Sequence, residues 1–107
     1  MNLEDRSVVV TGASTGIGRA TARAFADAGT RVGLAARTTA TLETLSEEIV
    51  ADGGESLVLP SDVRVREELE SAITTVRDTF GGLDVVVTNA GVGHRDRTGI
   101  VAGDLDE

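Results

Sequence analysis

An apolar run that ends in a glycine-rich turn constrains the fold of this chain more than any other feature. Three consecutive valines occupy positions 8–10, and glycines follow at positions 12, 16 and 18. An uninterrupted β-branched run is typical of a strand buried on both faces, as in a parallel sheet covered by helices. Residues 16–28, after the turn, have helical periodicity. The sequence therefore predicts a strand, a tight turn and a helix of an α/β fold.

The three glycines have a spacing that suits the binding of a phosphate group. Gly12 permits the turn, Gly16 lets backbone amides approach a pyrophosphate, and Gly18 lets the helix pack closely on the strand. Hydroxyls between the glycines can donate to phosphate oxygens, and the unpaired amides of the helix face the anion. Helix capping is the alternative role of these hydroxyls, because it uses the same amides. The predicted phosphate-binding residues are Gly12, Ser14, Thr15, Gly16, Ile17 and Gly18.

The rest of the chain alternates between apolar runs and amphipathic stretches. Runs at residues 31–36, 57–60 and 85–88 predict three further strands, and helical periodicity at residues 38–52 and 65–80 predicts two further helices. Strict alternation with right-handed crossovers predicts a doubly wound parallel sheet with strand order 3-2-1-4. In the first helix, the residues expected to face the sheet are Ile17, Ala20, Ala24, Phe25 and Ala28.

Two motifs in this frame carry a family resemblance. The pattern Thr-Gly-x-x-x-Gly-x-Gly at residues 11–18, with Asn-Ala-Gly at residues 89–91 after the fourth apolar run, resembles the short-chain dehydrogenase/reductase family. Asp62-Val63 after the third apolar run adds to the resemblance, which covers nearly the whole chain. The resemblance implies a Rossmann-type fold that binds a dinucleotide. It also implies an oxidoreductase that transfers hydride between a nicotinamide cofactor and an alcohol or carbonyl carbon.

The resemblance also assigns roles to residues that follow the third and fourth strands. Asp62 is expected to bind the adenine amino group, and Val63 to line the adenine pocket. The alternative role of Asp62 is an N-cap for the helix that follows. Asn89, Ala90 and Gly91 are expected to border the ribose on the nicotinamide side, and the alternative there is an ordinary strand-to-loop turn.

The end of the second strand bears on the choice between NAD and NADP. An acidic residue about 20 positions beyond the glycines would bind the ribose hydroxyls of NAD, whereas an arginine would accommodate the 2′-phosphate of NADP. The chain has Ala36-Arg37-Thr38 there and no acid. We therefore expect NADP rather than NAD, with Arg37 on the phosphate and Thr38 assisting through its hydroxyl. A solvated surface arginine is the alternative.

Catalytic residues of the family type are missing from the sequence. All ten basic residues are arginine, and the chain contains neither lysine nor tyrosine. Members of the family usually carry a catalytic Tyr and Lys four residues apart, with a Ser upstream, all later than this chain reaches. We therefore expect residues 1–107 to be a truncated, N-terminal cofactor-binding domain that binds without catalysing. A stand-alone dinucleotide-binding or interaction module is the alternative. His94 is expected to be solvated rather than catalytic.

The end of the chain has a different character from the rest. Residues 92–103 lack a sustained period, so we expect an exposed loop there, and residues 104–107 resemble the start of the next helix of the family. The fourth strand would then be an open sheet edge, through which we expect the chain to form a homo-oligomer.

Composition excludes several other classes of function. The net charge of −8 disfavours nucleic acid and anionic membranes as partners. The absence of cysteine excludes disulfides and thiolate metal sites, and one histidine supports no zinc site. The charged N-terminus lacks the apolar core of a signal peptide, and no apolar run reaches membrane-spanning length, so the cytoplasm is the expected location.

Overall fold

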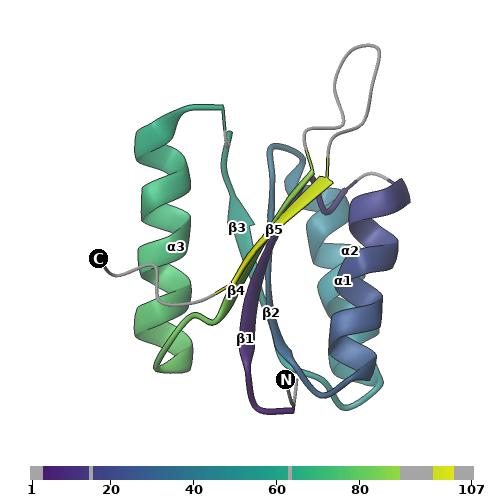
Figure 1. Cartoon of the computed structure of the whole chain (residues 1–107). Coiled ribbons are helices and arrows are strands. Elements are labelled where there is room, and N and C mark those ends of the chain that lie inside the picture. Colours follow the sequence, from purple (N-terminus) through teal and green to yellow (C-terminus); the bar gives the residue numbers. More distant parts are fainter. Residues whose placement is uncertain (1–3, 15, 63, 90–97, 103–107) are drawn as a thin grey trace.

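The chain folds as a single sheet between two layers of helices, as the computed structural model in Figure 1 shows. The structure describes residues 4–14, 16–62, 64–89 and 98–102. Helices α1 and α2 cover one face of the sheet, and helix α3 covers the other (Figure 1). In chain order the elements are β1 (Ser7–Thr11), α1 (Gly16–Asp27), β2 (Arg31–Ala36), α2 (Thr39–Ala51), β3 (Ser56–Pro60), α3 (Arg66–Phe80), β4 (Val85–Asn89) and β5 (Thr98–Ala102).

The strand order across the sheet is β3-β2-β1-β4-β5. The first four strands are parallel, so the predicted fold class and the order 3-2-1-4 are confirmed. Strand β1 lies at the centre, where Val9 is the register partner of both Gly33 on β2 and Val86 on β4. Every residue of β1 is buried, which is the physical reason for its uninterrupted valine run.

Each face of the sheet forms its own hydrophobic core. Successive side chains of a strand point to opposite faces, so Val8 and Val10 pack toward α1 and α2, whereas Val9 packs toward α3. Gly33 allows α3 to come close to β2, because a Cβ there would lie 2.6 Å from Cγ2 of Val76. Among the described residues, no helix is both long enough and apolar enough to cross a membrane.

Helix α1 turns a different face to the sheet than the one predicted. The buried residues of α1 are Gly18 and Ala22, and Phe25 packs partly buried against the same core. Ile17 is 48% exposed, so its predicted place in the core was wrong. An alanine-rich helix offers two neighbouring faces with similar apolar spacing. The face with the smaller side chains, which begins at Gly18, allows the helix to lie close to the turn after β1. Of the predicted stripe, Ala20, Ala24 and Ala28 are exposed.

The predicted exposed loop over residues 92–103 was wrong for residues 98–102. These form β5, which pairs antiparallel with β4, and Ile100 is the register partner of Val87. Strand β4 is therefore not the open edge that we expected. The physical reason is that a buried β4 would otherwise carry a row of unpaired backbone groups, which a fifth strand satisfies. Residues 92–97 and 103–107, with the predicted start of a further helix, lie outside the described residues.

Candidate cofactor-binding site

The candidate site lies along the edge of the sheet where the four parallel strands end. Parallel strands bring their carboxyl ends to the same edge, where ligands of doubly wound folds bind. Backbone hydrogen bonds hold the segments that follow these strands side by side. The Ala13 amide donates to the Ala35 carbonyl at 3.3 Å, and the Ser61 amide donates to the Ala36 carbonyl at 2.8 Å. The Thr11 hydroxyl donates to the Val87 carbonyl at 3.3 Å, which links the turn after β1 to β4.

Two glycines, one in the turn after β1 and one in helix α1, are required by the backbone geometry. Gly12 has a φ of +64°, in the left-handed region that favours glycine. Gly18 lies so close to the turn that a Cβ there would be 2.0 Å from the Gly12 carbonyl oxygen. Helix α1 therefore begins directly against the end of β1, with the unpaired amides of its first turn at the strand-end edge.

Gly16 differs from these two glycines because packing within the chain does not require it. Gly16 is the first residue of α1 and is exposed, and a Cβ added there would meet no described atom within 4 Å. Among the described residues, therefore, nothing beyond the chain neighbours of Gly16 occupies the space beside its Cα, where a pyrophosphate could approach the helix N-terminus. Ser14 is half-buried and Ile17 is exposed at the same end of the helix. Thr15 lies outside the described residues.

Arg37 and Thr38 follow β2 directly and are both exposed. Thr38 is the N-cap residue of α2, yet its side chain makes no capping hydrogen bond. Arg37 forms no hydrogen bond or ion pair with any residue that the structure describes. By contrast, Arg19 and Arg23 are both held by carboxylates. Arg37 is therefore available to an anionic group at this edge.

Asp62 follows β3 and is held by an arginine that the sequence reasoning did not identify. Its Oδ1 accepts hydrogen bonds from Nε of Arg64 at 3.0 Å and from the Arg64 amide at 3.1 Å. Its Oδ2 accepts from Nη2 of Arg64 at 3.0 Å. These hydrogen bonds from Arg64, with a further contribution from the charge of Arg37, lower the pKa of Asp62 from 3.8 to about 2. The Asp-x-Arg spacing was the available sequence signal, because it lets a side chain reach back two residues.

The alternative role of Asp62 as the N-cap of α3 does not hold, because Val65 occupies that position. Asn89 is the last residue of β4 and the register partner of Thr98. It therefore lies at the strand-end edge with the other predicted residues. Val63, Ala90, Gly91 and His94 lie outside the described residues.

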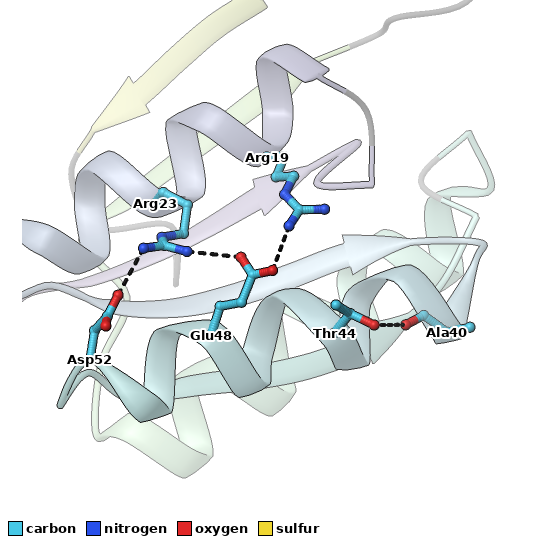
Figure 2. A network of polar contacts seen from close by, with 6 residues as sticks. All are labelled: Arg19, Arg23, Ala40, Thr44, Glu48 and Asp52. Atoms are coloured by element: carbon cyan, nitrogen blue, oxygen red, sulfur yellow. Dashed lines mark hydrogen bonds and ion pairs between the residues drawn. The ribbon is translucent and has the colours of Figure 1, made fainter.

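A network of ion pairs joins the two helices behind the site (Figure 2). Oε2 of Glu48 on α2 accepts from Nη2 of Arg19 at 2.7 Å, and its Oε1 accepts from Nη1 of Arg23 at 2.8 Å. Arg23 also reaches Asp52 through Nη2 at 2.8 Å. The network holds α1 against α2. Helix α1 follows the glycine turn, and α2 begins two residues after Arg37. Helical periodicity alone did not reveal it, because the pairs are more than 24 residues apart.

A hollow of about 420 Å³ lies at the opposite edge of the sheet, among the amino ends of the strands. Its lining includes Ser7, Arg31 and Asp84, and none of the predicted cofactor-binding residues. The turn at the strand carboxyl ends, rather than this hollow, therefore matches the predicted chemistry.

Comparison with known proteins agrees with this geometry. The family model described as short chain dehydrogenase matches residues 6–103. A short chain dehydrogenase of Pseudocercospora fijiensis is 38% identical over 90 residues, which are 84% of this chain and 29% of the relative. An uncharacterized oxidoreductase of Listeria monocytogenes is 35% identical over 92 residues, which are 86% of this chain and 37% of the relative.

Solved structures show the same relationship. A short-chain dehydrogenase/reductase from Mycobacterium marinum superposes with a TM-score of 0.81 at 35% identity, covering 87% of this chain and 38% of that protein. A metagenomic short-chain oxidoreductase in complex with NADP gives a TM-score of 0.79 at 42% identity, covering 87% of this chain and 42% of that protein. The chain thus spans well under half the length of these relatives. With nearly all of its residues matched by the family model, the chain belongs to the short-chain dehydrogenase family.

Proposed function

We propose that this chain is the cofactor-binding portion of an oxidoreductase that uses NADP(H) in preference to NAD(H). The observation that carries the proposal is the exposed Arg37 at the end of β2, which lacks a hydrogen-bond or ion-pair partner among the described residues and has no acid next to it in the sequence. A guanidinium binds a phosphate dianion through two parallel hydrogen bonds, and a carboxylate in its place would repel the same group. The related metagenomic oxidoreductase with bound NADP supports the choice of cofactor.

The residues present fit such a cofactor along the strand-end edge. The open space at Gly16 and the helix N-terminus behind it suit the pyrophosphate. Arg37 and Thr38 would hold the 2′-phosphate, and Asp62 the adenine amino group. Asn89 would border the ribose on the nicotinamide side. Thr15, Val63, Ala90 and Gly91 belong to the same proposal by their place in the sequence.

When bound, the nicotinamide supplies the hydride donor or acceptor for an alcohol or carbonyl carbon. This chain's own residues bind and orient the cofactor. They include no Tyr or Lys to exchange the proton at the substrate oxygen. A dinucleotide-binding module without catalysis is the alternative. One specific observation favours it, namely that β5 already closes the edge of β4 within the described residues.

Replacement of Arg37 by alanine tests the cofactor preference. Loss of two charge-assisted hydrogen bonds should weaken NADPH binding by about 1.5–3 kcal/mol, while NADH binding stays almost unchanged. Calorimetric titration of both cofactors into wild type and Arg37→Ala gives the two affinities.

The matched control is Arg66→Ala, which removes an arginine whose side chain is 87% exposed and pairs only with Glu70 among the described residues. This control should leave both affinities unchanged. Equal weakening of NADPH and NADH by Arg37→Ala would contradict the assignment of Arg37 to the phosphate.

A further inference from the structure

The end of β3 brings a carboxylate next to the proposed phosphate site. Ala36 is the register partner of Pro60, so Arg37 and Asp62 lie just beyond paired residues of neighbouring strands. Arg37 is close enough for its charge to contribute to the lowered pKa of Asp62. A phosphate monoester carries about −1.5 to −2 charges at neutral pH. An uncompensated Asp62 carboxylate would therefore repel the 2′-phosphate of NADP(H).

A second carboxylate adds to the negative charge at the end of β3. Oε1 of Glu68, on the first turn of α3, accepts a hydrogen bond from the Asp62 amide at 2.7 Å. Two carboxylates, those of Asp62 and Glu68, thus lie at the end of β3. Among the residues that the structure describes, the cation that binds the Asp62 carboxylate directly is Arg64. Arg64 contacts both carboxylate oxygens of Asp62, with Nε at 3.0 Å and Nη2 at 3.0 Å. This planar, two-point contact is the strongest geometry for a guanidinium and a carboxylate.

We propose that Arg64 shields the charge of Asp62 and thereby determines, together with Arg37, that this site tolerates the 2′-phosphate of NADP(H). In this arrangement Arg37 attracts the phosphate, and Arg64 removes the repulsion from the neighbouring strand end. Oδ2 of Asp62 can still accept a hydrogen bond from an adenine amino group, because it accepts only one from Arg64, whereas Oδ1 accepts two. The inference rests on the proposed function, since it concerns the same cofactor.

The test is the ratio of the NADPH and NADH dissociation constants in the purified protein. Removal of the shield by Arg64→Ala should worsen NADPH binding relative to NADH by about threefold to tenfold, the size expected for one partly screened charge near the ligand. Arg64→Lys loses the two-point contact but keeps the positive charge near Asp62, so the ratio should stay within about twofold of wild type. Arg66→Ala, two residues further along the chain, should leave the ratio unchanged.

A double variant separates charge shielding from direct contact with the phosphate. Asp62→Asn in the Arg64→Ala background removes the repelling charge, so the ratio should return to within about twofold of wild type. Any effect of Asp62→Asn on the adenine applies to both cofactors and cancels in the ratio.

The outcomes distinguish this inference from the proposed function. An unchanged ratio in Arg64→Ala overturns the shield, and so does a raised ratio that Asp62→Asn fails to restore. In both cases Arg37→Ala still reports on the proposed function separately. Wild-type protein that binds neither cofactor would overturn the proposed function and the shield together.

Discussion

Replacement of Gly18 by alanine should destabilise the fold through a backbone clash. The added Cβ would lie 2.0 Å from the carbonyl oxygen of Gly12, 2.7 Å from its carbonyl carbon and 3.1 Å from Cα of Ala13. All three are backbone atoms, so no side chain can rotate away. Ordinary contact begins at 3.4 Å, and the β1 turn and helix α1 must therefore separate by about 1.4 Å at this point.

The free energy of that separation can be estimated from mutations that add a carbon atom to a packed protein core. Forcing an extra carbon into a packed interior costs about 1–3 kcal/mol, and the rigid backbone partners put Gly18→Ala at about 3 kcal/mol. In a domain of this size each kcal/mol lowers the melting temperature by about 4–8 °C, so we expect a fall of at least about 12 °C. Thermal and urea unfolding followed by circular dichroism measures both quantities.

Gly16 provides the matched control, because it is two residues away in the same helix. Gly16→Ala meets no described atom within 4 Å and should leave stability within about 0.5 kcal/mol of wild type. Gly16→Val should also fold, yet lose at least about tenfold in affinity for both NADPH and NADH, because its side chain fills the space proposed for the pyrophosphate.

Two results would refute this reasoning. If Gly18→Ala unfolds at the wild-type temperature, the helix does not approach the turn as closely as the structure has it. If Gly16→Val folds and binds both cofactors with wild-type affinity, the pyrophosphate does not occupy the space in front of α1.

Two further predictions concern the proton chemistry. Because hydrogen bonds from Arg64 lower the pKa of Asp62 from 3.8 to about 2, their contribution to stability is complete above pH 3.8 and is lost as the pH falls through about 2. Carboxyl-carbon NMR should show Asp62 titrating near pH 2, and Arg64→Ala should return it toward its ordinary value; a wild-type inflection near 3.8 would contradict the ion pair. The 107-residue polypeptide should reduce no ketone with NADPH, because it holds no Tyr or Lys to supply the proton, and spectrophotometric detection of steady turnover would show a different proton donor.

Local patterns in the sequence were sufficient to predict the four parallel strands and the three helices. The valine run of β1 has no polar alternation because both of its faces are covered, and that condition alone predicts a central parallel strand. The alternation of strands and helices with right-handed crossovers then leaves few possible topologies. The same argument places Arg37 and Asp62 at one sheet edge, because each follows a parallel strand.

Tertiary contacts decided the features that the sequence left open. Two faces of α1 have similar apolar spacing, and the close approach of Gly18 to Gly12 selects the one that is buried. The short run that forms β5 lacks a strand pattern of its own and is a strand because β4 offers it a partner.

The sequence by itself determined strands β1 to β4, the three helices, their order and the residues at the strand-end edge, because hydrophobic periodicity and turn chemistry act between near neighbours in the chain. Only the tertiary structure decided which helix face is buried, that β5 covers β4, and that Glu48 joins Arg19 to Arg23. These depend on which side chains and strand edges meet in space, and no local pattern records such meetings.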